Sequence, residues 1–429
     1  MNRSFSLPAL PFVLALLLSG PAAAATFTVM NLADSGPGSL RQTVLDANAA
    51  AGADEVTFAP GLSGTITLTT DQIAITDPLV VSGPGIGVLT ISGNDLFRIF
   101  LVEKPAVDAP IDVTLGGLTL THGSSLSALP GTDGGAVLAL GENLRILNSV
   151  ISHSRSESGG GGIAFHSLST RALLMIESST IAEDSASDKG FGGGILASDS
   201  DARILDSTIS GNSSLEGGGI LSNEGSLEIL NSTISGNQAQ AFGGGISGRG
   251  PILLRLTTLT QNTAKVRGGG ITFETFLVSG FPELDHSIVG NNSPEDLTYT
   301  GMIPGGLESN YSLIEAPGSV FVGGAHNLIG ADPYLGPLAD NGGPTPTHAL
   351  LPGSPARDAG NPSISGPPAT DQRGSVRILG PSIDLGSVEG GTFVEVPTLS
   401  QVGLFLLVAS LLVAGTIRLR RHEAARPVA

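Results

Sequence analysis

A glycine-rich block that recurs through the middle of the chain constrains the fold more than any other feature. Measured between the apolar residues that close each copy, from Val137 onward, the copies are 26, 32, 25, 26 and 25 residues apart. A period of this length predicts a repeat protein in which each unit packs on the next. The block reads Gly-Gly-Gly-Ile and begins at Gly160, Gly192, Gly217, Gly243 and Gly268, with an imperfect Gly-Gly-Ala-Val copy at Gly134.

A second motif keeps the same period and ends in a polar column. A cation or a sugar could bind stacked Asn and Asp side chains. A structural ladder is the favoured interpretation, because Asn tolerates left-handed turns and its amide can bond the copies above and below. The apolar centre of the motif recurs at Ile151, Ile181, Ile209, Ile234, Leu259 and Ile288. The predicted ladder, three residues further on, consists of Asp184, Asn212, Asn237, Asn262 and Asn291.

Short alternating runs in each unit, such as Leu227-Glu228-Ile229, predict strands, because alternation with a period of two gives a strand one apolar face. Strands this short bury that face only when successive coils stack. The predicted fold class is therefore all-β, a right-handed parallel β-helix of the pectate-lyase-like type. A β-propeller is disfavoured, because its blades are about 40 residues long.

The first 25 residues are typical of a secretory signal peptide, with Arg3, an apolar run and a small-residue cleavage site at Ala23 to Ala25. The protein is therefore expected to be exported across the inner membrane. Residues 26–116 are predicted to form an N-terminal cap and the first coils. Ser39 to Gln42 has the pattern of a helix start and Gly52 that of a stop, so a capping helix is expected between them.

Residues 396–429 are predicted to form a sorting signal with a transmembrane helix and a basic tail. The stretch from Leu399 to Leu419 is apolar or small over about the 20 residues that a membrane span needs. Arg418, Arg420 and Arg421 fall at its end, and the positive-inside rule places them in the cytoplasm. The body of the protein is then anchored outside the membrane, or displayed or secreted after the tail is processed. A buried core helix would not explain the arginine cluster.

This tail resembles the IPTL-type sorting signal of Gram-negative bacteria. Val396 stands where that signal usually has Ile, and Val402 where it usually has Trp. The resemblance implies an exosortase-like processing enzyme as a partner. It rests on Val396, Pro397, Thr398, Leu399, Ser400 and Gly403.

Residues 27–58 and 327–386 resemble bacterial surface β-helix proteins that carry a choice-of-anchor Q region. The most specific runs are 336–345, 348–356 and 370–374, whereas Arg357 stands where an aliphatic residue is usual. The repeats also resemble those of chlamydial polymorphic outer-membrane adhesins. Both resemblances imply a surface protein with a β-helical body.

The charge and residue types exclude several kinds of partner and site. The chain has 38 acidic and 20 basic residues, a net charge of −18, which argues against nucleic acid as a partner. It has no cysteine, so disulfides and Cys-based metal sites are excluded. No cofactor or metal site is predicted. Calcium is a minor alternative among Asp340, Asp358 and Asp371.

β-Helices often host polysaccharide lyases and glycosidases, so the chain could carry catalytic residues of those enzymes. The sequence predicts none. Glycosidases need two carboxylates across a groove, but the best pair, Glu183 and Asp184, would point to opposite faces of a strand. Thr132 to Gly134 is expected to be a turn that leads into the first glycine block and not part of a catalytic site. The arginines in strand segments have no matched set of three acidic residues, and the histidines occupy unrelated phases of the repeat. These residues are Arg145, Arg171, Arg203, Arg255, His153, His166 and His286.

The regular repeats are expected over residues 117–292, followed by further coils and the anchor-associated region over 293–395. In that region, His348, Asp340 and Asp358 are expected to have structural roles, and Asp371 is expected to pair with Arg373. The leading functional hypothesis is a membrane-attached adhesin or structural protein that binds a glycan or a cell-surface ligand. The alternative is a cell-surface carbohydrate-active enzyme.

Overall fold

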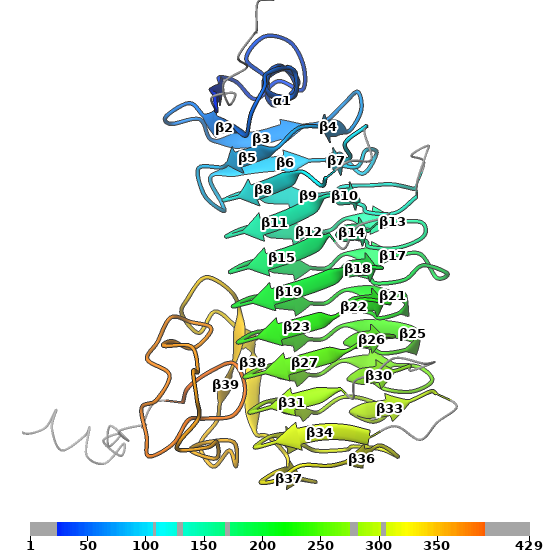
Figure 1. Cartoon of the computed structure of the whole chain (residues 1–429), viewed down its shortest axis with the longest axis vertical. Coiled ribbons are helices and arrows are strands. Elements are labelled where there is room, and N and C mark those ends of the chain that lie inside the picture. The colour runs from blue at the N-terminus through cyan, green and yellow to red at the C-terminus, as the bar shows by residue number, and fades with distance from the viewer. Residues whose placement is uncertain are drawn as a thin grey trace, which may run out of the picture. The chain divides into compact units, whose positions relative to one another are not determined.

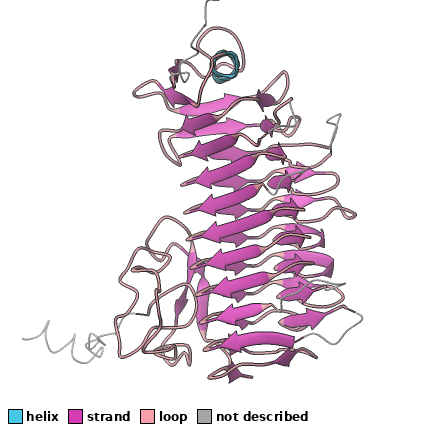
Figure 2. Cartoon of the chain, in the orientation of Figure 1, coloured by secondary structure: helices cyan, strands magenta, loops and turns pink. Residues whose placement is uncertain are grey.

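Short strands stack in register from one coil to the next and form parallel sheets that run the length of a solenoid (Figure 1). The computed structural model describes residues 24–105, 109–126, 132–167, 172–274, 282–301 and 306–390. These residues belong to one unit that ends at Gly390. The parallel pairing confirms the predicted parallel β-helix. Strands dominate the described residues (Figure 2).

The first sheet has twelve parallel strands, one from each successive coil. Its strands alternate buried and more exposed residues, as predicted from the period-two pattern. They are β1 (Thr26–Val29), β2 (Asp54–Phe58), β5 (Leu79–Ser82), β8 (Asp112–Gly116), β11 (Asn143–Leu147), β15 (Leu173–Glu177), β19 (Asp201–Leu205), β23 (Leu227–Leu230), β27 (Ile252–Arg255), β31 (Glu283–Asp285), β34 (Gly306–Asn310) and β36 (Phe321–Val322).

The second sheet follows the first in each coil after a sharp corner. It carries the inward column of the second sequence motif, in which Ile209 pairs with Ile234 and Ile234 with Leu259. Its strands are β3 (Gly64–Thr67), β6 (Leu89–Ser92), β9 (Thr119–Thr121), β12 (Val150–Ser152), β16 (Thr180–Ala182), β20 (Thr208–Ser210), β24 (Thr233–Ser235), β28 (Thr258–Thr260), β32 (Ile288–Gly290), β35 (Leu313–Ile314) and β37 (Leu328–Ile329).

The third sheet begins where each glycine block ends, so Val137 pairs with Ile163 and Ile163 with Ile195. Its strands are β4 (Ile73–Ile75), β7 (Phe100–Val102), β10 (Val137–Leu140), β14 (Ile163–His166), β18 (Ile195–Ser198), β22 (Ile220–Asn223), β26 (Ile246–Gly248), β30 (Ile271–Phe273) and β33 (Leu297–Tyr299). A fourth, short sheet precedes it in the central coils: β13 (Arg155–Ser156), β17 (Ser185–Ala186), β21 (Ser213–Glu216), β25 (Gln238–Phe242) and β29 (Thr263–Ala264).

The inward side chains form one apolar core that extends from Val29 in the first coil to Val320 near the last. Removing these side chains from water is the main favourable term for a solenoid, because each coil buries its apolar face only against its neighbours. The predicted helix is present as α1 (Leu40–Ala49), and the Ser39 side chain accepts a hydrogen bond from the main-chain N of Gln42. This helix lies at the N-terminal end of the solenoid (Figure 1).

The solenoid ends earlier than the sequence predicts. Coils were expected to about Glu395, but the last stacked strand is β37, which ends at Ile329. The following residues, 331–390, are called the strap here. The strap begins with an antiparallel pair, β38 (Leu335–Ala339) and β39 (Thr347–Leu350), and then continues through turns along the flank of the lower coils (Figure 1).

The strap covers the outward face of the second sheet over its later strands, from β20 onward. Leu350, Ala356 and Leu385 form a second apolar cluster with Ile288 and Leu313 of the solenoid. These contacts turn an outward sheet face into buried surface, which a solenoid of uniform coils would leave in water.

Within the described residues, no helix has the length and apolar character needed to cross a membrane. The predicted signal peptide before residue 24, the sorting signal from Val396, the arginines of the basic tail and Arg171 lie outside the described residues.

Candidate functional site

An amide ladder runs through the interior at the end of the second sheet. Nδ2 of Asn212 donates to Oδ1 of Asn237 at 2.9 Å, Asn237 donates to Asn262 at 2.9 Å, and Asn262 donates to Asn292 at 3.0 Å. Each amide also donates to a main-chain carbonyl of the preceding coil, as Asn237 does to Ile209 at 3.0 Å. These side chains are buried and their hydrogen bonds are internal, so the geometry gives the ladder a structural role.

The assignment of Asn291 to this ladder is wrong by one residue. Asn292 occupies the rung, whereas Asn291 is exposed and donates to Oε2 of Glu315 at 2.7 Å. Leu259 pairs with Val289 and not with Ile288. A shift of one residue along a strand exchanges its inward and outward faces, so Ile288 points outward. It is nevertheless buried, because the strap covers it.

Asp184 is the ladder member nearest the N-terminus, where a carboxyl group takes the place of an amide. Its Oδ1 accepts from the main-chain N of Ser154 at 2.7 Å, while its buried Oδ2 has no partner. At the equivalent position, Nδ2 of Asn212 donates to the carbonyl of Ile181 at 3.0 Å. Burial raises the pKa of the Asp184 carboxyl well above its usual range. The raised pKa favours the protonated, uncharged form of this buried carboxyl.

We expect Asp184→Asn to stabilise the protein by about 1 kcal/mol or more at pH 8, with a smaller gain toward pH 4. A pKa that is raised in the folded state gives stability that is complete below the unfolded pKa and is lost as the pH rises through the folded pKa. Asparagine does not ionise, so the variant does not lose this stability. Denaturant unfolding of both proteins from pH 4 to 8 measures the difference in their free energies of unfolding. A destabilised variant with no pH trend would contradict a raised pKa at Asp184.

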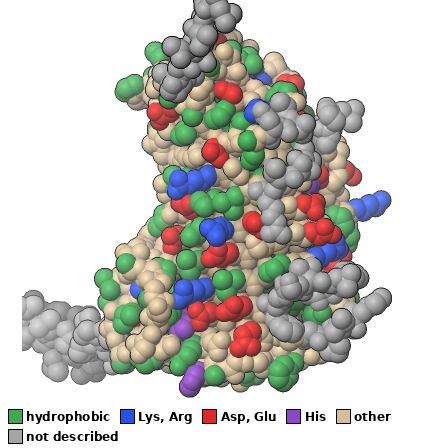
Figure 3. All heavy atoms as spheres, viewed as in Figure 1, with side chains coloured by type: hydrophobic (Ala, Val, Ile, Leu, Met, Phe, Trp, Pro, Cys, Tyr) green, Lys and Arg blue, Asp and Glu red, His purple; other side chains and the backbone are tan. Residues whose placement is uncertain are grey.

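Three ion pairs join neighbouring coils along the outward face of the first sheet, where basic and acidic side chains alternate (Figure 3). Each arginine meets one carboxylate of the following coil, so the arginines do not face a common acidic cluster. Exposed pairs of this kind contribute about 0–1 kcal/mol each. The pairs are Arg145 with Glu177 at 2.6 Å, Arg203 with Glu228 at 3.0 Å and Arg255 with Asp285 at 2.9 Å.

The three histidines considered from the sequence lie apart, each with its own carboxylate. His153 pairs with Glu183, His166 with Asp133 at 3.2 Å and His286 with Asp285. His122 was not among the predicted residues, and its ring stacks on that of His153 with centroids 5.5 Å apart. Their separation of one coil could have revealed this contact.

The carboxylate pair considered from the sequence does not share a face. Glu183 is exposed, with a φ of +59° in the turn between β16 and β17, while its neighbour Asp184 is buried. Within the described ranges, no group of three or more His, Asp or Glu side chains is placed to hold a metal ion.

The strap is anchored to the second sheet by buried polar side chains. Nε2 of Gln372 donates to Oγ1 of Thr208 at 2.9 Å and to the carbonyl of Ser207 at 3.1 Å. His348 Nδ1 lies 2.7 Å from the carbonyl of Gly336 and must donate to it, so Nε2 accepts from the Ser235 hydroxyl at 2.8 Å. Burial lowers the pKa of His348, in agreement with this neutral form.

Gln372→Ala is expected to free the strap without unfolding the coils. Loss of these buried hydrogen bonds costs about 2 kcal/mol, which corresponds to about thirtyfold faster local opening. Limited proteolysis or hydrogen exchange of residues 331–390 measures this rate. Gln238→Ala, an exposed glutamine on β25, should leave the rate unchanged. Equal rates for the two variants would show that Gln372 is not an anchor.

The polar residues predicted in the strap do not converge on one site. Asp371 pairs with Arg373 at 2.6 Å, as predicted, and also accepts from the main-chain N of Glu389. Asp340 accepts from Gly342 within a turn, and the main-chain N of Asp358 donates to Asp384.

Two further charged groups are buried inside the strap. Burial lowers the pKa of Arg377 to about 10, and burial together with Asp384 raises the pKa of Glu389 to about 7. The interior of the strap therefore contains charged groups, while Gln372 contacts the solenoid with an uncharged side chain.

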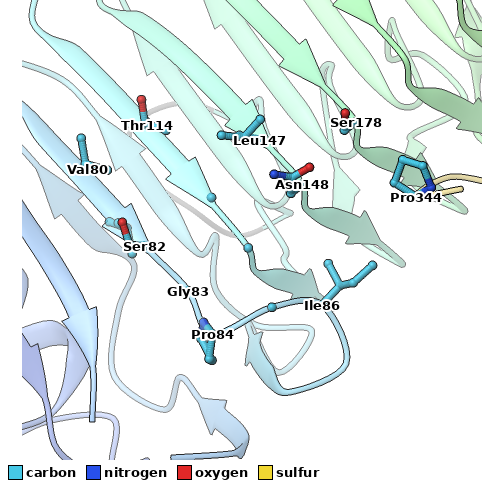
Figure 4. A pocket seen from close by; sticks show the side chains of 14 residues that line it. Val80, Ser82, Gly83, Pro84, Ile86, Thr114, Leu147, Asn148, Ser178 and Pro344 are labelled. Atoms are coloured by element: carbon cyan, nitrogen blue, oxygen red, sulfur yellow. The ribbon is translucent and has the colours of Figure 1, made fainter. Parts of the chain in front are cut away.

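A groove of about 450 Å³ lies where the first sheet meets the corner to the second sheet (Figure 4). It crosses β5, β8, β11 and the end of β15. The loop from Gly83 to Ile86 borders one end and Pro344 of the strap the other. Gly83 is required in this loop, because a Cβ there would lie 2.3 Å from the carbonyl oxygen of Gly117. Glycine thus allows the loop to lie against the next coil.

The chemistry of the groove follows from its lining, which consists of aliphatic, glycine, proline, hydroxyl and amide groups. Val80 and Ile86 are 41% and 47% exposed. Thr114, Asn148 and Ser178 add hydrogen-bonding groups. This lining can contact an uncharged ligand through apolar packing and hydrogen bonds, but its own side chains supply no acid or base at neutral pH. No pattern in the sequence predicted this groove.

A scan against protein-family models finds no match, and a search of curated proteins finds none. Among solved structures, the chain is similar to the crystal structure of pectate lyase Pel9A, with 14% identity and a TM-score of 0.47. The match covers 87% of this chain and 98% of that chain. At this identity and score the likeness bears on the fold alone, and we base no functional argument on it.

Proposed function

We propose that this protein is exported, attached at the cell surface through its C-terminal segment, and acts as a binding protein without catalysis. The observation that carries this proposal is the lining of the groove at the first sheet, which offers apolar and hydrogen-bonding groups without a titratable side chain. Ligand sites commonly combine an apolar surface with a few polar groups that orient the ligand.

The proposed location rests on sequence features at both ends. The first 25 residues have the pattern of a signal peptide, and residues 396–429 have that of a membrane-spanning sorting signal. The runs that resemble a choice-of-anchor Q region, 336–345, 348–356 and 370–374, fall in the strap. This region precedes varied anchors in the proteins it resembles, which supports surface attachment.

A carbohydrate-active enzyme is the second candidate, and one observation favours it. A second hollow of about 280 Å³ lies on the first sheet and contains Asp112 and Arg145. A carboxylate and an arginine beside a hollow could take part in acid–base chemistry on a sugar chain. In this structure, Arg145 pairs with Glu177, and Asp112 accepts from Asn143 at 2.8 Å.

The two candidates are separated by mixing the purified full chain with neutral and acidic polysaccharides, with and without calcium. New reducing ends and unsaturated uronic products report turnover. We expect no turnover, together with saturable attachment of the protein to cell surfaces. Turnover that Arg145→Gln abolishes and Arg203→Gln retains would establish the enzyme instead. Arg203 is a matched control, because it also pairs with a carboxylate of the next coil but lies outside the hollow.

A further inference from the structure

The strap shows how an extended segment binds this solenoid at its corner. The residue that turns the chain between the first and second sheets has a positive φ, 50° at Asp206 and 53° at His286. In both residues the carbonyl oxygen accepts from the strap: Thr345 Oγ1 donates to Asp206 at 3.2 Å, and the Gly386 main-chain N donates to His286 at 2.8 Å. The corner is thus an interface whose acceptors are main-chain carbonyls.

The groove continues this interface along the same corner toward the N-terminus. Asn148 and Ser178 occupy the same repeat position, with φ of 47° and 46°, and both line the groove. Pro344, next to Thr345, lies at the groove's end. The carbonyl oxygens of Asn148 and Ser178 accept no hydrogen bond from the part of the chain that the structure describes. They are therefore available to donors of a ligand.

The groove also offers apolar contacts of the kind that the strap makes with the solenoid. Leu350, Ala356 and Leu385 of the strap pack with Ile288 and Leu313 of the solenoid, and Oγ1 of Thr208 donates to the carbonyl of Pro346 at 2.6 Å. In the groove, Val80, Ile86 and Leu147 provide an apolar wall. A charged group placed against this wall would lose water without gaining a partner, because no lining side chain carries a charge.

We propose that the groove binds an extended, uncharged, proline-containing polypeptide segment of a partner protein. The segment would lie along the corner between the first and second sheets, as the strap does on the later coils. This inference rests on the proposed binding function and names its partner class. Proline fixes the backbone close to the extended polyproline conformation, so such a segment loses little entropy on binding. The groove spans four coils, about 14 Å at about 4.8 Å per coil, which corresponds to about five residues in that conformation.

The test uses the purified full chain and a fluorescent peptide with the sequence of residues 341–347, Asn-Gly-Gly-Pro-Thr-Pro-Thr. The strap fills its own position on the lower coils, so free peptide reports on the remaining corner. Anisotropy is expected to show saturable binding that Val80→Glu weakens at least about tenfold, because a carboxylate would then be buried against the peptide. Val266→Glu is the control, at a valine that is 51% exposed and does not line the groove.

Each outcome decides the proposal. Binding that Val80→Glu weakens and Val266→Glu retains supports it, as does weaker binding of a peptide with Asp in place of its first proline. Failure of the peptide to bind, or binding insensitive to Val80→Glu, overturns it. Groove-dependent binding of a neutral oligosaccharide in place of the peptide also overturns it, while the proposed binding function stands. Polysaccharide turnover, measured separately, would instead overturn the binding function. Unfolding midpoints of both variants show that they are folded.

Discussion

Replacing Asn237 by alanine is expected to lower the free energy of unfolding by about 3 kcal/mol, because buried groups that lose a partner cost about 1–3 kcal/mol each. The Asn237 side chain accepts from the main-chain N of Asn212 at 3.0 Å and donates to the carbonyl of Ile209 and to Asn262. Alanine satisfies none of these groups, and water cannot reach them in the core. Denaturant unfolding followed by circular dichroism measures the change.

Asn291→Ala is the matched control, since it makes the same chemical change at an exposed asparagine one residue away from the ladder position. We expect its free energy of unfolding to fall by only about 1 kcal/mol, because Asn291 has a φ of +59°, which Asn adopts more readily than Ala. A loss at Asn291 as large as that at Asn237 would contradict the register described here. A loss at neither position would show that the ladder contributes little to stability.

Gly218→Ala is expected to destabilise the protein by about 3 kcal/mol, at the upper end of the usual cost of overpacking. Gly218 is the middle residue of a glycine block, and a Cβ there would lie 2.5 Å from the main chain of Gln238 and of Gly244. These are backbone atoms held by the hydrogen bonds between coils, so they cannot move aside independently. The loss should appear as a lower unfolding midpoint and a smaller yield of folded protein.

Gly236→Asn provides the contrast, because Gly236 is needed neither for space nor strictly for its backbone angle. Its φ is +67°, and the nearest atom to an added Cβ is 3.9 Å away. Other coils place His153 or Glu183 at this turn with similar φ. Asparagine is therefore expected to cost less than about 1 kcal/mol. If both glycine variants lost the same stability, the close approach of neighbouring coils would not be the reason for the glycine block.

The proposed binding site depends on features separated by long distances in the sequence. Its wall comes from four successive coils, and its end is formed by Pro344 of the strap. Each contributor is an ordinary residue for a β-helix surface. Only their arrangement around the corner, with main-chain carbonyls facing outward, indicates a site for an extended ligand.

The coil period, the inward column and the place of the glycine blocks were predictable from the amino-acid pattern alone. These features are local and repeated: an apolar residue every second position and a tight bend every coil leave a stacked β-helix as the way to bury Ile163 on Ile195 and Ile195 on Ile220. The pairing of Asp371 with Arg373 was also predictable, because the two residues lie close together in the chain.

The position of the strap and the register of the last coils depend on contacts between residues far apart in the chain, so the sequence pattern did not predict them. Ile288 is apolar, so the sequence pattern assigns it to the inward column, but Val289 takes that place and Ile288 packs outward against Leu385 of the strap. The hydrophobicity of a residue predicts that its side chain is buried, but it does not predict which surface covers that side chain. The contact between residues 288 and 385, and the groove that ends at Pro344, arise from a segment that folds back over coils far from it in sequence, which no local pattern encodes.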